Sequence, residues 1–370
     1  MKAGSEKRIV IKVGTSTLTN DAGMLDSAQL KNVSDQIAAL AGSGFEIVLV
    51  TSGAIRVGMA RLGLTAIHSL RESQAAAAVG QGLLMHLYQE LFQAHDMMVA
   101  QILLIAQDFR ERRRYLNARN TLLTLFEQKA LPIINENDTV AVDEIKFGDN
   151  DNLAAQVTGL VNAATLIFLS DVDGLYAREN GKLAKRIGQV ESVTSEIEAL
   201  AGTANSKYSR GGMVSKINGA RIAMAAGAHV FIANGREENV LRRLLDGEDL
   251  GTHFHPQTAW RDSRRRWIGM SSTPIGTLKV DMVAGKKLIS QGASLLAAGI
   301  IEVAGEFRAG DVVQIVDDQN HEIGRGLSNY SADEISRIKG IHSRFFPQLL
   351  GYCGDPEVVH RNNMFTYNSR

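Results

Sequence analysis

Cysteine, net charge and long apolar runs are all scarce in this 370-residue sequence. Cys353 is the single cysteine, so no disulfide can form within the chain. The 40 basic and 40 acidic side chains cancel, which leaves no global positive field to hold a polyanion such as nucleic acid. No stretch reaches the roughly 18 apolar residues of a membrane helix, and the first apolar run is too short for a signal peptide. These absences favour a cytoplasmic protein that acts on small molecules.

Short apolar runs alternate with segments of helical period from Arg8 to about Gly251. One such segment, residues 27–41, has apolar side chains on one face and Ser27 as its expected N-cap. Continuous apolar strands separated by helices indicate parallel strands that are buried on both faces. We therefore predict an α/β fold, a three-layer α/β/α sandwich with a mainly parallel sheet. The predicted strands are RIVIKV, EIVLVT, VAQILL, LPIIN, TLIFLS and HVFIAN.

A change of sequence style near residue 256 predicts a domain boundary. The stretch HFHPQTAWRDSRRRW, residues 253–267, interrupts the helical rhythm with a proline and a basic run. Short strand-like pieces split by Gly, Asp and Asn turns follow, among them GTLKVD, DVVQIVD and EIGRGLSNY. We predict a catalytic domain over residues 1–255, a linker over 256–274 and a small β-rich domain with a C-terminal tail over 275–370.

Two strand ends carry residues suited to an anionic ligand. Lys12 lies at the end of the first strand, at the sheet edge where open α/β folds bind ligands. The turn VTSGAI ends the second predicted strand and places Ser52 and Gly53 at the start of a helix, which suits an anion. Taken singly, the lysine is better explained as a solvated strand-end residue and the TSG stretch as an ordinary turn.

The common nucleotide-binding motifs are absent. There is no P-loop, no protein-kinase catalytic loop and no complete dinucleotide fingerprint. SRGGMVSK, residues 209–216, instead brings glycines, a hydroxyl and Lys216 together at a helix start. This pattern predicts a phosphate cradle of a less common kind.

Polar residues also crowd two further places in the chain. The stretch KFGDNDNLAA contains Asp149, Asn150, Asp151 and Asn152 just before an apolar helix. The strand LPIIN ends in an unusually polar stretch, residues 135–138. A polar loop with a helix cap, for which Asn152 is the candidate, is the structural alternative to a functional site.

The motifs together resemble the glutamate 5-kinase family of the amino-acid kinases. IVIKVGTS, VTSGAI, VGQ, NARNTL, INENDTV, GDNDNLAA, SDVDGLY and GGMVSK occur in the order and at the spacings of that family. The pair INEND and GDNDNL is the most specific part, since KVGTS alone indicates only the superfamily. The C-terminal part, with GTLKVD and GRGLSNYSADEI, resembles a PUA domain, so the resemblance covers essentially the whole chain.

This resemblance implies transfer of the ATP γ-phosphoryl group to the side-chain carboxylate of L-glutamate, the first step of proline biosynthesis, with Mg²⁺ as cofactor. The acceptor carboxylate has a reference pKa near 4.3 and is already ionised at neutral pH, so no general base is needed. Catalysis then consists of positioning two anions and cancelling their charge. The alternatives are another amino-acid kinase, acting on aspartate, acetylglutamate, carbamate or uridylate, or an RNA-binding PUA protein.

The resemblance also implies roles for individual residues. Lys12 and Lys216 neutralise the transferring phosphoryl group, and Asp151 orients both ammonium groups without acting as a base. Ser52, Asp138 and Asn150 contact glutamate, with Asn135 nearby, and Asp138 is the expected partner of the α-ammonium. The implied ATP-binding residues are Lys12, Ser170, Asp171, Arg210, Gly211, Gly212, Met213, Val214, Ser215 and Lys216.

The chain departs from the family pattern at Arg210, where many members have threonine, and at Ser170, where some have threonine. Arginine at 210 puts the hydroxyl contact to the nucleotide in doubt, although it could reach phosphate oxygens. The nine histidines, including the HFH of residues 253–255, show no metal-ligand spacing, so no metal ligands are expected. By resemblance we also expect feedback inhibition by proline, a homo-oligomer (dimer or tetramer), and a possible contact with glutamate 5-phosphate reductase. Whether the PUA domain also binds RNA is left open by the sequence.

Overall fold

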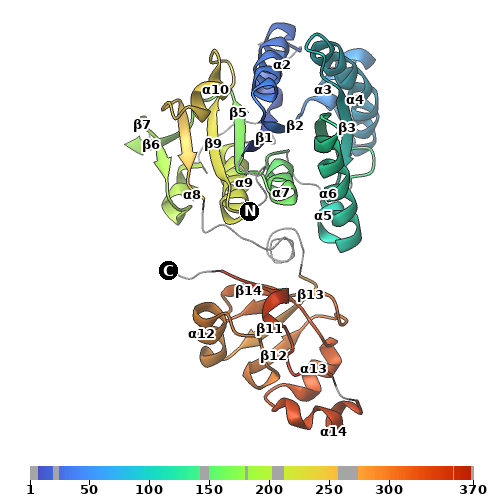
Figure 1. The fold of residues 1–370 in the computed structure, drawn as a ribbon, viewed down its shortest axis with the longest axis vertical. Coiled ribbons are helices and arrows are strands. Elements are labelled where there is room, and N and C mark those ends of the chain that lie inside the picture. Colours follow the sequence, from blue (N-terminus) through green and yellow to red (C-terminus); the bar gives the residue numbers. More distant parts are fainter. Residues whose placement is uncertain are drawn as a thin grey trace. The chain divides into compact units, whose positions relative to one another are not determined.

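The computed structural model describes residues 7–19, 25–141, 150–179, 182–201, 212–256, 274–352 and 354–367. The chain divides into two compact units, Met1–Ala259 and Trp260–Arg370 (Figure 1). Each unit has its own hydrophobic core. Residues 257–273 of the expected linker lie outside the described part. No helix in the part that is described has the length and apolar character to cross a membrane.

An eight-stranded sheet forms the centre of the first unit, in the order β3-β4-β2-β1-β5-β9-β10-β8. The strands from β3 to β9 in this order are parallel, and β10 runs antiparallel to β9. β4 and β5 are buried along their whole length, as strands covered on both faces should be. The predicted mainly parallel sheet is confirmed. The strands are β1 Arg8–Val13, β2 Glu46–Val50, β3 Val99–Leu104, β4 Leu131–Glu136, β5 Thr165–Ser170, β8 Gln189–Val190, β9 His229–Asn234 and β10 Gly251–Phe254; β6 Leu175–Glu179 and β7 Lys182–Ile187 form a separate hairpin.

Helices cover both faces of this sheet (Figure 1). Apolar side chains of α2, α4 and α10 pack in one core with Ile9, Ile11 and Val13 of β1. Helix α7 contacts β1 and β5 on the opposite face, α9 lies against α7 and β9, and α6 contacts β4 and α7. The helices are α1 Thr15–Leu18, α2 Ser27–Gly42, α3 Ala54–Leu62, α4 Leu70–Gln93, α5 Ala106–Arg110, α6 Arg112–Glu127, α7 Asn150–Val161, α8 Ser195–Ala201, α9 Met213–Ala225 and α10 Val240–Leu245.

Two expected helix caps differ in the structure. Helix α2 begins at Ser27, but its cap is Asp26, whose carboxylate accepts a hydrogen bond of 3.1 Å from the Gln29 backbone N–H. The Ser27 cap was therefore wrong by one residue, because an equally good capping side chain precedes it. Helix α7 begins at Asn150, so Asn152 lies inside its first turn and is not its cap.

The second unit is built on a five-stranded sheet in the order β12-β11-β13-β14-β15. Its pairs are antiparallel except for β11 with β13, and the buried faces of the strands pack against helices α12 and α13. The predicted small β-rich domain is confirmed. The elements are β11 Gly276–Val280, α12 Met282–Gln291, β12 Ile300–Ala304, β13 Val312–Val316, β14 Glu322–Leu327, α13 Ala332–Ile338, α14 Phe346–Leu350 and β15 Met364–Thr366, with short 3₁₀ turns at Ala297–Gly299, Ser343–Phe345 and Arg361–Asn363.

Candidate active site

Side chains along β1 point alternately to the two faces of the sheet, and this determines where Lys12 lies. Ile9, Ile11 and Val13 enter the core under α2 and α4, so Lys12 faces the other layer, which contains α7 and α9. Lys12 pairs with Val50 and Phe168 in the middle of the sheet, and β1 ends one residue later. The residue is only 3% exposed, so its ammonium needs a compensating charge close by.

Asp151, in the first turn of α7, supplies that charge. Its Oδ1 lies 2.5 Å from Lys12 Nζ, and its Oδ2 lies 3.2 Å from Lys216 Nζ on α9. The carboxylate is fully buried and Lys216 is 6% exposed. The three residues predicted to form the catalytic group are therefore brought together from three elements distant in sequence. The group carries two positive charges and one negative charge at the edge where the parallel strands end.

The environment of Asp151 keeps its carboxylate ionised. Burial alone would raise its pKa, but the charges of Lys12 and then Lys216, together with hydrogen bonds, lower the pKa below its ordinary value of 3.8. The Ser215 hydroxyl contributes one of these bonds, donating to Oδ2 at 2.7 Å. A carboxylate with so low a pKa is a poor proton acceptor at neutral pH. Its geometry suits the orientation of the two ammonium groups.

A glycine sets how closely α9 approaches α7. A Cβ placed on Gly219 would lie 3.0 Å from the Asp151 carbonyl oxygen and 3.0 Å from the Phe168 ring. Gly219 lies one helical turn after Lys216, so both residues face α7. The distance between Lys216 and Asp151 therefore depends on the absence of a side chain at Gly219, a residue that the sequence motifs do not single out.

Asn150 ties together three other predicted residues beside the charged group. Its side-chain amide Nδ2, with two N–H donors, has three acceptors within hydrogen-bond distance: the Thr51 carbonyl oxygen at 2.5 Å, Ser52 Oγ at 3.1 Å and Asn135 Oδ1 at 2.7 Å. These contacts join the ends of β2 and β4 to the start of α7. Ser52, Asn135 and Asn150 thus form one cluster, as expected for neighbours in a substrate site.

Two residues that were not predicted hold this cluster in place. Gln81 Oε1 on α4 accepts a hydrogen bond of 2.8 Å from Asn135 Nδ2. Its VGQ motif contributed to the resemblance, but no role had been assigned to it. The Thr51 hydroxyl lies 2.8 Å from the hydroxyl of buried Tyr88, also on α4. Helix α4 therefore contacts and supports the ends of both β2 and β4.

Two glycines let α4 approach closely enough to do this. A Cβ on Gly58 of α3 would lie 1.7 Å from the Ala76 carbonyl oxygen, and one on Gly80 of α4 would lie 1.7 Å from the Ala54 carbonyl oxygen. The two helices cross backbone to backbone at these positions. Gly53, with φ +105°, makes the left-handed turn that leads from Ser52 into α3.

The residues predicted for the nucleotide lie on two neighbouring elements. Ser170 ends β5 and its hydroxyl donates to Asp171 Oδ1 at 3.1 Å. Gly212 precedes α9, Ser215 and Lys216 face Asp151, and Val214 is 49% exposed. Arg210 and Gly211 lie outside the described residues. Asp138 lies half-buried in the turn after β4, and its predicted contact with the α-ammonium stays a prediction.

The fold and the site together indicate the class of protein. A parallel sheet covered by helices, with two buried lysines converging on one aspartate where the strands end, is suited to binding and transferring an anionic group. The model of the amino acid kinase family matches residues 7–234, and that of the PUA domain matches residues 276–346. The chain therefore belongs to the amino acid kinase family and, within it, to the glutamate 5-kinases, with a PUA domain.

Glutamate 5-kinases from other organisms align with almost the whole chain. A glutamate 5-kinase of Thermoanaerobacter sp. (strain X514) is 45% identical over 360 residues, covering 96% of this chain and 97% of the relative. One from Herminiimonas arsenicoxydans is 46% identical over 366 residues, covering 97% and 98%. A carbamate kinase from Giardia lamblia bound to AMP-PNP resembles the fold, with a TM-score of 0.50 and 17% identity, covering 70% of this chain and all of that one.

Proposed function

We propose that this chain transfers the γ-phosphoryl group of ATP to the side-chain carboxylate of L-glutamate, giving glutamate 5-phosphate and ADP, as the first step of proline biosynthesis. The observation that carries the mechanism is the contact of Lys12 and Lys216 with opposite oxygens of Asp151. The near-complete coverage by glutamate 5-kinases at 45–46% identity supports the substrate.

The reaction needs charge compensation more than proton transfer. A glutamate side-chain oxygen, already ionised, attacks the γ-phosphorus while the bond to the bridging oxygen of ADP breaks and ADP leaves with the negative charge. Both reactants are anions and repel each other. An ammonium group has three N–H donors, and its bond to Asp151 requires only one, so Lys12 and Lys216 can turn donors toward phosphoryl oxygens. Asp151 holds both amines in a fixed direction before the substrates arrive.

The amide cluster is the proposed glutamate side of the site. Ser52, Asn135 and Asn150 offer a hydroxyl and two amides at the ends of β2 and β4. Such groups can bind a carboxylate with directional hydrogen bonds. We assign the α-ammonium of glutamate to Asp138, because a buried cation needs an anionic partner.

The nucleotide side is proposed along the ends of β5 and the start of α9. Ser170 and Asp171 follow β5, and the segment from Gly212 to Lys216 opens α9 with backbone N–H groups suited to phosphate oxygens. Arg210 and Gly211 would extend this side. Their contribution is a prediction from the family pattern.

Mg²⁺ is expected with ATP, but Asp151 does not fit the role of its ligand. Both oxygens of that carboxylate are within 3.2 Å of an ammonium group, and a divalent cation there would face two positive charges. We therefore assign no protein ligand to Mg²⁺ and expect it to be carried by the nucleotide phosphates. When bound, it would neutralise phosphate charge, and no step above is routed through it.

Regulation and partners extend the proposal. We expect proline to inhibit at or overlapping the glutamate site, the kinase units to associate as a dimer or tetramer, and the unstable acyl phosphate to be passed to glutamate 5-phosphate reductase, all in the cytoplasm. The PUA domain is proposed as a structural or regulatory module. Retention on heparin or tRNA at moderate salt would test for RNA binding instead.

A hydroxamate assay for the acyl phosphate tests the reaction directly. The purified chain is assayed with Mg²⁺-ATP and, in parallel, with glutamate, aspartate, acetylglutamate and carbamate. Turnover is expected with glutamate and near background with the others. Acyl phosphate formed from aspartate but not from glutamate would contradict the substrate assignment. Lys31→Ala, which removes a lysine that is 64% exposed, is the matched control for lysine variants.

A further inference from the structure

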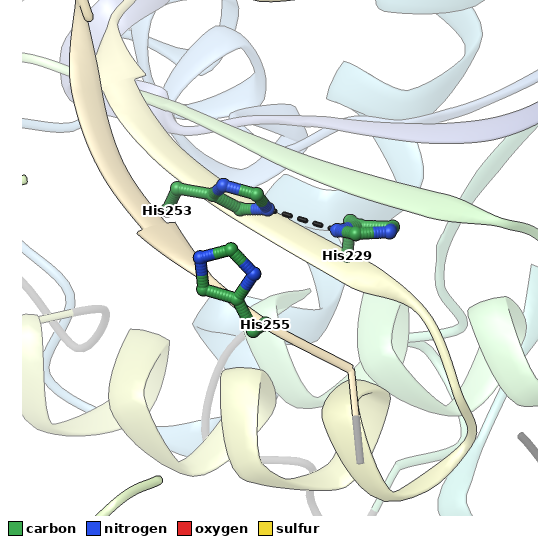
Figure 2. A group of neighbouring side chains, drawn as sticks. All are labelled: His229, His253 and His255. Atoms are coloured by element: carbon green, nitrogen blue, oxygen red, sulfur yellow. Dashed lines mark hydrogen bonds between the residues drawn. The ribbon is translucent and has the colours of Figure 1, made fainter. Parts of the chain in front are cut away.

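Three histidines gather on β9 and β10, away from the kinase site. His229 opens β9, His253 lies in β10, and His255 follows its end. β9 and β10 are antiparallel with His253 opposite Phe231, which places His255 opposite His229 on the same face of the pair. Figure 2 shows the three rings close together on these two strands. Their spacing of 24 and 2 residues differs from the usual ligand spacing of structural zinc sites, and the antiparallel pairing of β9 and β10 is what brings them together.

The ring nitrogens are near one another. His229 Nδ1 and His253 Nε2 are 2.9 Å apart, and the ring centroids of His253 and His255 are 4.1 Å apart. One nitrogen from each of the three residues lies within 4.8 Å of the others. His253 is also stacked on Phe231, with ring centroids 4.3 Å apart and nearly parallel planes, which fixes its orientation.

We propose that His229, His253 and His255 form a binding site for one divalent transition-metal ion, with zinc as the preferred ion. Zn–N bonds of about 2.0–2.1 Å in a tetrahedron require nitrogens about 3.3 Å apart, a spacing within the range present here. Small rotations of the rings would therefore complete three bonds. All three side chains are partly exposed, so water can supply the fourth ligand.

The type of ligand determines the type of ion. Three imidazoles favour Zn²⁺, Co²⁺, Ni²⁺ or Cu²⁺, whereas Mg²⁺ and Ca²⁺ prefer oxygen ligands. Neutral imidazole is the form that binds metals.

Glu191 is placed to orient the third ring. His255 Nε2 is shielded from solvent and has no hydrogen-bond partner among the described residues, and Glu191 Oε1 lies 3.6 Å from it. With Nε2 directed to Glu191, Nδ1 is left for the metal, and a ring nitrogen of His255 faces His229 in Figure 2. A carboxylate behind a ligating histidine fixes its tautomer and strengthens it as a ligand. Glu191 follows β8, which pairs with β10, so the ion would join three segments of the sheet edge.

The site is separate from the phosphoryl-transfer group. His229 opens β9 and Asn234 closes it beside Ser170, and five residue steps of about 3.3 Å put them roughly 17 Å apart. The proposal is therefore independent of the proposed function. An ion here would hold β9, β10 and the chain just before residue 257 together.

Metal binding by the full-length, tag-free chain tests this directly. Protein stripped with chelator and then dialysed is titrated with Zn²⁺ by calorimetry, and with Co²⁺ while the visible spectrum is recorded. We expect a site of 1:1 stoichiometry, tetrahedral Co²⁺ bands and a rise in Tm with Zn²⁺ but not with Mg²⁺. No 1:1 binding in the micromolar range would overturn the proposal.

Three variants identify the ligands. His253→Phe keeps a ring stacked on Phe231 but removes the nitrogens, and it should abolish the Co²⁺ bands and the Zn²⁺-induced rise in Tm. Glu191→Gln should weaken Zn²⁺ binding by about tenfold, since it removes the orienting charge. His86→Ala, which removes a histidine 66% exposed on α4, is the matched control and should bind as wild type. If His253→Phe does not fold by circular dichroism, His229→Asn replaces it. Unchanged stoichiometry and affinity in the folded ligand variant would show that the ion binds elsewhere.

Discussion

The two ends of the central sheet concentrate very different side chains. Where the parallel strands end, Lys12, Asp151 and Lys216 form a nearly buried group of three full charges. At the start of β9, three partly exposed imidazoles face one another, and the pKa of two of them is lowered. The first arrangement suits an anion that moves during a reaction. The second suits a cation that stays in place.

The difference shows how each group remains compatible with burial. Two buried ammonium groups are tolerated because a fully buried carboxylate lies between them and lowers their mutual repulsion. His229 and His253 need no counter-ion, because desolvation lowers the pKa of each ring and so favours its neutral form. The buried charges of Lys12, Asp151 and Lys216 thus lie where the proposed chemistry requires charge, and substitutions at each end of the sheet test this comparison.

The largest expected effect is loss of catalysis when one of the two ammonium groups is removed. Lys216→Ala should lower kcat by about 10²- to 10³-fold or more, because the transferring phosphoryl group loses one of its two positive contacts. The hydroxamate assay at saturating glutamate and ATP measures this. Lys31→Ala should stay within about twofold of wild type. Near-normal turnover of Lys216→Ala would remove this lysine from the phosphate site.

Neutralising Asp151 should destabilise the fold as well as the site. Asp151→Asn leaves Lys12 and Lys216 facing each other without a buried anion, which should cost about 3–5 kcal/mol of unfolding free energy. Asp35→Asn, at an exposed ion pair with Lys31, should cost about 0–1 kcal/mol. Urea denaturation followed by circular dichroism separates the two. Equal stabilities would mean that the buried charges are compensated in some other way.

The same variant predicts a difference in acid sensitivity. The folded-state pKa of Asp151 is below its ordinary value of 3.8, so its contribution to stability is present above that value and is lost as pH falls through the lower, folded-state pKa. Wild type should therefore lose stability more steeply than Asp151→Asn as pH falls below about 4. Denaturation midpoints at successive pH values measure the two slopes. Parallel curves would contradict an ionised Asp151 in the folded state.

Much of the site at the carboxyl ends of the parallel strands could be predicted, because the sequence patterns that indicate it are local. Lys12 closes an apolar run, and Lys216 and Asp151 each sit at a helix start, so the sheet topology brings them to one edge. The roles of Gly219 and Gln81 depend on which helix packs against which, and one sequence does not show that. The histidine group illustrates the same limit, because its members become neighbours only through the antiparallel register of β9 and β10. The cap of α2 was wrong for a local reason, since adjacent Asp and Ser are both good capping residues.

A smaller loss of catalytic rate is expected when α9 is pushed away from α7. Gly219→Ala places a methyl group 3.0 Å from the Asp151 carbonyl oxygen and the Phe168 ring, so α9 must shift by a few tenths of an ångström. We expect kcat to fall by about tenfold, because Lys216 moves with the helix. Gly82→Ala on α4 is the control, since a Cβ there meets nothing within 4 Å. If both variants keep full activity, the position of Lys216 does not depend on this close approach.

The smallest expected effect is on glutamate binding, when Gln81, which supports the cluster of Ser52, Asn135 and Asn150, is replaced. Gln81 holds Asn135, and Asn135 in turn holds Asn150, so Gln81 acts on the glutamate site only through its neighbours. Losing one such hydrogen bond costs about 1 kcal/mol, which corresponds to about a fivefold change in affinity. Gln81→Ala should therefore raise KM for glutamate about fivefold while kcat and KM for ATP change little. Gln93→Ala, exposed at the end of the same helix, controls for general effects on α4. A loss confined to kcat would instead place Gln81 beside the phosphoryl group, and the division between a charged transfer centre and an uncharged substrate cluster would have to be redrawn.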